Sequence, residues 1–365
     1  MSYKKTAIVF VGLGRPSVTA TEELYRLQNI PVVYNQTKNI VGLIQYYLMS
    51  NSLFRHVRLP KRKEGNRNYN RLLDKIGIPK TDLTLQHAIL ADMYRLQLNT
   101  FITNHAAYAE LNHRAKGLKF DYTTGYSFGI YNAIVASGAL DFEDALMMVK
   151  EAAKIITNAS KKLNGGLAII RWKGPYDLEP ELERIGDKKV KIAIDNSPNM
   201  KVLAGPIKDL DRIISYFKND KDFRKAEGAA KLLNGVNIPF HSDYMKDVAD
   251  LIWWYIVKED RRSEKGSFIG KAKHELIAPT STKSILDPLD ILAESIESIR
   301  CRIRWSDTIK RATDELGITR YIVIGIDEGD SVAKSIGILY PDIAKVEILR
   351  VKDRNSLDKV VLQFA

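Results

Sequence analysis

Cysteine is the scarcest residue type in this sequence, with one copy, Cys301, among 365 residues. A single cysteine excludes an internal disulfide and is typical of a protein from a reducing compartment. Cys301 lies in a short strand-like or connecting segment, Ile-Arg-Cys-Arg-Ile-Arg-Trp, and we interpret it as structural and not as a nucleophile. The sequence therefore predicts a cytoplasmic protein without disulfides.

Long hydrophobic runs are also missing. No stretch of about 18 apolar residues is present, which excludes a transmembrane helix. The apolar stretch over residues 7–11 is too short for the core of a signal peptide. We therefore expect no membrane partner, and 365 residues are enough for a large core and two domains.

Acidic residues are fewer than basic residues, 44 against 56, which gives a net charge of +12. Such a charge fits either a nucleic acid or an acidic protein as partner. No recognition-helix pattern, zinc-ligand spacing or aromatic-interleaved basic repeat is present, so we predict no nucleic-acid partner and no metal site. One basic cluster over residues 54–76, which includes Lys61, Arg62 and Lys63, fits a solvated insertion or a docking surface for an acidic carrier.

The most informative motif that is present is G-x-S-x-G at residues 125–129, with Ser127 at its centre. We call these residues the serine turn. A short strand-like approach over 120–124 precedes it and an apolar helical run over 130–136 follows. Flanking glycines permit a strained turn that projects the hydroxyl, and the helix start offers N–H groups to an oxyanion. The pentapeptide alone is a weak signal, because glycine and serine are common residues.

Other patterns outline the fold. Residues 6–11 predict a buried strand that enters a loop at Gly12, and a dinucleotide site is excluded because Ser17 stands at the third glycine position. Three short strands over 165–205, with helical stretches near 178–185 and 207–218, predict a small α+β unit of the split βαβ kind. Helical periodicity covers 20–53, 82–114 and 142–156, and we expect the last strands near 345–351 and 359–365.

His241 is the candidate base. It is the one of six histidines that stands at the end of a strand-like approach, residues 236–240, after a proline. A serine hydroxyl is a poor nucleophile until a base takes its proton, and the pKa of histidine suits that role near pH 7.

Four segments together resemble the malonyl-CoA:acyl carrier protein transacylase family, which includes the acyltransferase domains of polyketide synthases. They are GYSFGIYNAIVASGALDFEDAL (125–146), NSPNMKVLAG (196–205), NIPFHSDYM (237–245) and RWSDTIKRATDELGITRYIVIG (304–325). The resemblance implies an α/β fold in which an α/β-hydrolase-like large domain, residues 1–160 and 236–365, carries an inserted ferredoxin-like small domain, residues 161–235. It implies coenzyme A and phosphopantetheine thioesters as substrates, acyl carrier protein as partner, and no metal or bound cofactor. We expect a monomer.

The resemblance also implies the roles of individual residues. Ser127 attacks the thioester carbonyl and His241 acts as its base. A backbone carbonyl near Ser298, in place of an aspartate, orients the histidine. The backbone N–H groups of Leu13 and Phe128 form the oxyanion hole.

Several positions depart from the family pattern, and three of them bear on the site. Leu13 stands in place of a glutamine, Tyr126 in place of a histidine, and Ala152 in place of the arginine that pairs with the malonyl carboxylate. A carboxylate buried without a cation costs several kcal/mol, and the apolar periodicity leaves Lys154 to the side of the inward face. We therefore expect a neutral acyl group in a pocket that includes Tyr126, Ala152 and Phe240.

Three functions fit these observations. The first is a discrete serine acyltransferase that moves a non-malonyl acyl group between coenzyme A and acyl carrier protein by a ping-pong acyl-serine mechanism, in polyketide or fatty-acid-type biosynthesis. The second is a hydrolase that releases acyl groups from carrier proteins with the same Ser127 and His241. The third, a catalytically weak carrier-binding protein, is disfavoured because both residues are intact. The sequence does not separate the first two.

Overall fold

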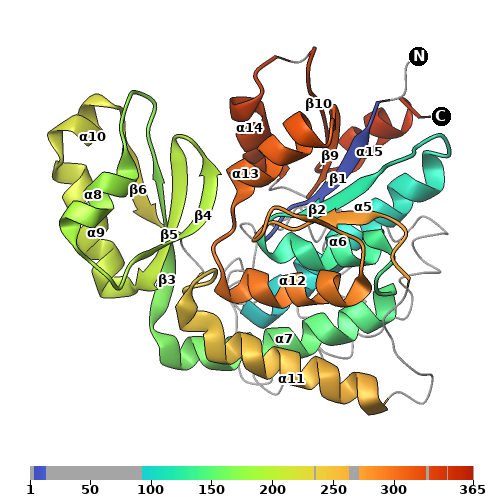
Figure 1. Cartoon of the computed structure of the whole chain (residues 1–365), viewed down its shortest axis with the longest axis horizontal. Helices are drawn as coiled ribbons and strands as arrows, with labels where there is room; N and C mark the ends of the chain where they lie inside the picture. Colours follow the sequence, from blue (N-terminus) through green and yellow to red (C-terminus); the bar gives the residue numbers. More distant parts are fainter. Residues whose placement is uncertain are drawn as a thin grey trace, which may run out of the picture.

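The computed structural model describes residues 4–13, 93–233, 236–262, 271–325, 329–342 and 344–364. The basic cluster over 54–76 and the helices expected over 20–53 and 82–92 lie outside the described residues. Within the described part, two sheets lie side by side, each with its own helices (Figure 1).

The larger sheet has the strand order β10-β9-β1-β2-β7-β8. All neighbouring pairs are parallel except β7 and β8, which are antiparallel. The central strand β1 is buried along its whole length, as expected for an apolar strand in a parallel sheet. The strands are β1 (Thr6–Phe10), β2 (Tyr122–Gly125), β7 (Glu275–Ile277), β8 (Ser284–Ile285), β9 (Arg320–Ile324) and β10 (Glu347–Val351).

Register within this sheet positions the serine turn. Phe10, the last residue of β1, pairs with Gly125, the last residue of β2. Because the two strands are parallel, the loop at Gly12 and the serine turn leave the sheet at the same edge.

The helices around the sheet are α5 (Met93–Arg114), α6 (Ile130–Ser137), α7 (Phe142–Leu163), α11 (Lys246–Arg262), α12 (Pro288–Arg300), α13 (Trp305–Lys310), α14 (Gly329–Leu339) and α15 (Arg354–Val361).

The smaller sheet is antiparallel, with the strand order β4-β5-β3-β6. Its elements are β3 (Gly165–Arg171), α8 (Leu178–Ile185), β4 (Lys191–Ser197), β5 (Met200–Pro206), α9 (Ile207–Asn219), α10 (Lys221–Lys225) and β6 (Ala229–Leu232). A hydrophobic cluster of its own, which includes Phe217 and Phe223, fills the space between this sheet and its helices. The predicted α+β unit and its two helical stretches are therefore confirmed, although the sequence analysis predicted three strands and missed β6. The domain limits at 160 and 235 stay a prediction.

Two local expectations are wrong. Residues 359–361 belong to α15 and not to a strand, because Asp353 and Ser356 form a capping box that starts a helix. The approach to His241, residues 236–240, contains no strand among its described residues, and His241 itself has a left-handed backbone with φ of 61°.

Candidate active site

The serine turn joins the buried strand β2 to α6 through a single 3₁₀ turn, Ser127–Gly129. Ser127 has φ of 54°, a left-handed conformation that few residues other than glycine adopt. A β-carbon at Gly125 would lie 2.2 Å from the Ile130 nitrogen, so only glycine fits this tight passage. The turn leaves the Ser127 side chain half-buried at the end of the sheet.

His241 faces this serine. Its ring Nδ1 bonds to the backbone carbonyl of Ser298, and its Nε2 lies 2.7 Å from Ser127 Oγ. Because a carbonyl only accepts, Nδ1 carries the proton and Nε2 is the basic nitrogen that faces the hydroxyl. The backbone N–H of His241 donates to the carbonyl of Ile299 at 2.8 Å, which fixes the residue at a second point.

Both carbonyls belong to the last turn of α12. The last four carbonyls of a helix have no partner inside it, and the helix dipole places partial negative charge there. In this chain Ser298 and Ile299 direct two of these carbonyls at His241. The helix end therefore orients the imidazole and favours its protonated form after proton transfer, as an aspartate does in other serine sites.

Burial lowers the pKa of His241 to about 4, and the bond to Ser298 opposes this shift in part. The ring is therefore neutral and able to accept a proton throughout the neutral range. We expect kcat/KM for thioester consumption to stay level as the pH falls from 8 to 5 and to fall only near pH 4. A half-maximal rate near pH 6.5, the usual pKa of histidine, would contradict this protonation state.

The same shift affects stability. Between pH 6.5 and 4 the unfolded chain binds a proton at His241 that the folded chain does not bind. This residue therefore favours unfolding progressively as the pH falls through that window.

The loop after β1 passes directly against the serine turn. A β-carbon built on Gly12 would lie 2.9 Å from Ser127 Cβ and 3.2 Å from the Phe128 nitrogen. The backbone nitrogen of Phe128 therefore lies at the point where the loop and the serine turn meet. The oxyanion-hole role of Leu13 and Phe128 stays a prediction from the family resemblance.

The three predicted pocket residues lie in different settings. Tyr126 donates its hydroxyl to Asn196 Oδ1 at 2.5 Å, and its ring meets that of Trp305 edge-on at 5.3 Å. Phe240 is buried next to His241. Ala152 is 1% exposed on the inward face of α7, within the main hydrophobic core.

The sequence did not single out Asn196, which ties the small sheet to the serine turn. Its segment belongs to the family resemblance, but nothing in the order of residues showed that β4 ends beside Tyr126.

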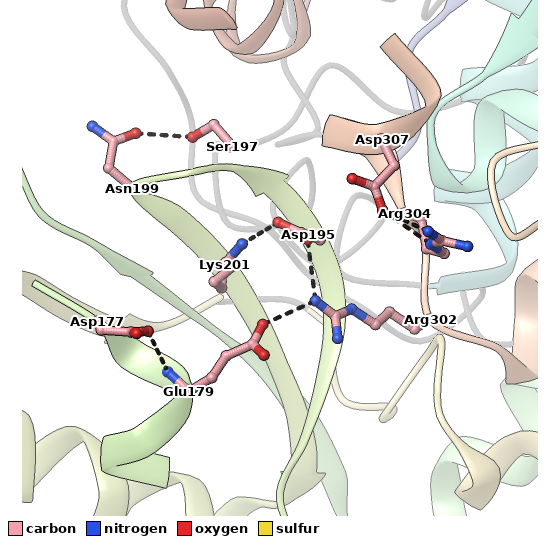
Figure 2. A network of polar contacts seen from close by, with 9 residues as sticks. All are labelled: Asp177, Glu179, Asp195, Ser197, Asn199, Lys201, Arg302, Arg304 and Asp307. Carbon is pink, nitrogen blue, oxygen red and sulfur yellow. Dashed lines mark hydrogen bonds and ion pairs between the residues drawn. The ribbon is translucent and has the colours of Figure 1, made fainter. Parts of the chain in front are cut away.

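A polar network joins the small sheet to the segment after α12 (Figure 2). The Asp195 carboxylate pairs with Lys201 and, at 3.1 Å, with Arg302, which also contacts Glu179 at 3.2 Å. Backbone bonds of 2.8 Å run from Asp195 to Ile303 and from Ile303 to Ala193. The C-terminal end of α12 contacts His241, and Arg302 and Ile303, which follow this end directly, bond to the small sheet.

Replacement of Asp195 with alanine is expected to lower the free energy of unfolding by about 3 kcal/mol, because it leaves the largely buried ammonium of Lys201 without its carboxylate. Urea denaturation measures this loss. Asp222→Ala is the matched control, since its partner Lys225 and Asp222 itself are both more than three-quarters exposed, and it should cost less than about 1 kcal/mol. Equal losses for the two variants would contradict a structural role for the network.

Among the described residues, no group of three or more histidine, cysteine or acidic side chains is arranged to hold a metal ion. In the same part of the chain, no helix has the length and apolar character needed to cross a bilayer.

Comparison with known proteins identifies the family. A family model described as Acyl transferase domain matches residues 49–273, well over half of the chain. The chain belongs to this family. It is an enzyme, an acyltransferase of the type found in malonyl-CoA:acyl carrier protein transacylases and polyketide synthases.

Two relatives illustrate the match. The malonyl CoA-acyl carrier protein transacylase of Bacillus subtilis is 25% identical over 254 residues, 67% of this chain and 75% of the relative. The polyketide biosynthesis malonyl CoA-acyl carrier protein transacylase BaeC of Bacillus velezensis is 30% identical over 207 residues, 54% of this chain and 63% of the relative.

Solved structures show the same α/β fold. The malonyl CoA-acyl carrier protein transacylase of Coxiella burnetii superposes with a TM-score of 0.72 at 20% identity, covering 100% of this chain and 99% of that one. The Synechocystis malonyl-CoA:ACP transacylase superposes with a TM-score of 0.71 at 18% identity, with coverages of 97% and 99%.

Proposed function

We propose that this acyltransferase moves a neutral acyl group, and not malonyl, from one thioester to another through an ester on Ser127. Coenzyme A and acyl carrier protein supply the thiols. The observation that carries the chemistry is the 2.7 Å contact between Ser127 Oγ and the unprotonated Nε2 of His241.

The first half-reaction forms the ester. His241 Nε2 takes the hydroxyl proton while Ser127 Oγ bonds to the thioester carbonyl carbon. The N–H groups of Leu13 and Phe128 stabilise the negative oxygen of the tetrahedral intermediate. The carbon–sulfur bond then breaks, and the proton on Nε2 passes to the departing sulfur.

The second half-reaction reverses these steps with another thiol. His241 takes the thiol proton, the sulfur bonds to the ester carbon, and the bond to Ser127 Oγ breaks. The proton on Nε2 returns to Ser127, which restores the starting state. With water in place of the thiol the same residues release a free acid, so transfer and hydrolysis differ only in the acceptor.

The neutral acyl group follows from Ala152. Both relatives described above are named malonyl CoA-acyl carrier protein transacylases. The resemblance of residues 125–146 to that family is what assigns Ala152 to the position of its malonyl-binding arginine. The methyl group of Ala152 is enclosed in the main hydrophobic core, and alanine itself offers no cation to a malonyl carboxylate. Because transfer of an unpaired charge from water into an apolar site costs free energy, such a site favours an uncharged acyl group.

The wider setting belongs to the same proposal. In this proposal the larger sheet and its helices form an α/β-hydrolase-like domain. The small sheet and its helices, which follow the order β-α-β-β-α-β, form a ferredoxin-like insert. We propose a cytoplasmic monomer with no metal or bound cofactor that serves polyketide or fatty-acid-type biosynthesis. Its charge of +12 favours approach of an acidic carrier protein.

A partition experiment tests the proposal. The enzyme is mixed with acetyl-, butyryl- or malonyl-coenzyme A and a holo acyl carrier protein, and acylated carrier and free acid are both quantified. The proposal expects acylated carrier from a neutral donor at a rate well above that from malonyl-coenzyme A. Free acid as the main product would instead assign hydrolysis, and fastest transfer from malonyl-coenzyme A would overturn the neutral specificity.

A further inference from the structure

A buried carboxyl group on α12 has no part in the proposed chemistry. Glu294 is 6% exposed, and both of its oxygens accept hydrogen bonds from one residue, Thr280. The Thr280 backbone N–H lies 2.7 Å from Oε1, and the Thr280 hydroxyl lies 2.7 Å from Oε2. Burial raises the pKa of Glu294 to about 7, so the site holds a carboxyl group at a cost in solvation.

Thr280 is fixed to the sheet that carries the serine. It lies three residues after β7, and β7 pairs with β2, the strand that leads into Ser127. The Thr124 hydroxyl donates to the carbonyl of Ile277 at 2.7 Å, at the point where β7 ends. The neighbouring Pro279 carbonyl accepts from the Arg304 N–H at 2.7 Å, so this loop is held on both sides.

Glu294 is fixed to the helix that carries the histidine contacts. It lies one turn before Ser298 on the same face of α12, because residues four apart in a helix stack above one another. The carbonyls of Ser298 and Ile299 hold the ring and the backbone of His241. The pair Glu294–Thr280 thus connects the base's helix to the nucleophile's sheet.

We propose that Glu294 is a positioning residue: through Thr280 it fixes α12 against the sheet and thereby sets the distance between His241 and Ser127. The inference rests on the proposed roles of those two residues. Two hydrogen bonds to one residue restrain both the position of α12 along its own axis and its rotation about that axis. Apolar packing is less directional and restrains these two movements only weakly. A protein with a hydrophobic residue of the same size at this position would be as stable as one with a buried carboxyl group. Stability therefore does not explain the glutamate, whereas a positioning role does.

The test compares four variants by two readouts. The first readout is kcat and KM for thioester transfer. The second is the rate at which a fluorophosphonate labels Ser127, which needs only the serine and its base and no acyl substrate or carrier. Glu294→Leu removes both acceptors, and Thr280→Val removes one donor. Glu294→Gln keeps the geometry, because its amide oxygen accepts the N–H and its amide nitrogen donates to the hydroxyl.

Glu297→Gln is the matched control. It makes the same chemical change one turn along α12, but the Glu297 side chain bonds to Arg300 and Cys301 near its own helix end and, among the described residues, forms no hydrogen bond to the loop after β7. Thermal unfolding shows that each variant is folded at the assay temperature.

For Glu294→Leu we expect kcat and the labelling rate to fall by about ten- to hundredfold with KM unchanged, since small displacements of reacting groups cost factors of this size. Thr280→Val should show a smaller loss of the same kind, and it decides the question if Glu294→Leu does not fold. Glu294→Gln and Glu297→Gln should stay within about twofold of the parent protein.

The inference would be overturned if the folded Glu294→Leu and Thr280→Val proteins were labelled as fast as the parent protein. It would also be overturned if Glu297→Gln lost as much activity as Glu294→Leu. Failure of the parent protein itself to react with the fluorophosphonate would instead contradict the proposed function.

Discussion

Replacement of His241 with alanine is expected to lower kcat for thioester turnover about a thousandfold. The variant keeps the thioester site and the oxyanion donors but has no group at 2.7 Å from Ser127 Oγ to take its proton. Stopped-flow or discontinuous assay of thiol release from an acyl thioester measures the loss.

His113→Ala is the control for this change. His113 is exposed on α5, so the same substitution there should leave kcat unaltered. A His241→Ala protein that stays folded and retains more than about a tenth of the parent rate would contradict the assignment of His241 as the base.

Replacement of Gly12 with alanine is expected to lower kcat at least about a hundredfold. The new β-carbon would lie 2.5 Å from the Tyr126 carbonyl oxygen and 2.9 Å from Ser127 Cβ. Both neighbours belong to the strained turn that holds the nucleophile, so neither can move away without shifting Ser127 or its oxyanion donors. Labelling of Ser127 by a fluorophosphonate, measured beside kcat, reports the same displacement.

Gly337→Ala is the matched control because a β-carbon there has no neighbour closer than 3.9 Å. Gly337 lies within α14, where alanine favours the helix, so this variant should be as active as the parent and equally or more stable. If Gly12→Ala matched it in activity, the loop after β1 would not shape the serine turn.

The sequence predicted the local parts of this site well. The serine turn is encoded within five residues, because its glycines are needed where the strand meets the helix. The small sheet is encoded nearly as locally, by short strands and amphipathic helices in order. The strand expected over 359–365 was wrong, because the capping box of Asp353 and Ser356 starts a helix that continues to Val361.

The non-local parts came from resemblance or were missed. His241 lies 114 residues from Ser127, and only the family pattern placed the two together. The contacts of Asn196 with Tyr126 and of Glu294 with Thr280 depend on how α12 and the two sheets pack, which no spacing along the chain expresses. The assignment of Ala152 to the position of a family arginine also rests on the resemblance, and its effect on acyl specificity stays a prediction.

Intact-protein mass spectrometry tests the central claim most directly. The parent protein and Ser127→Ala are each mixed with acetyl, butyryl, longer-chain and malonyl thioesters, and the mass of the protein is then measured before and after addition of holo acyl carrier protein. We expect a neutral acyl adduct on the parent protein, none on Ser127→Ala, and its discharge by the carrier thiol. Malonyl as the main adduct, or an adduct that persists in Ser127→Ala, would contradict the account.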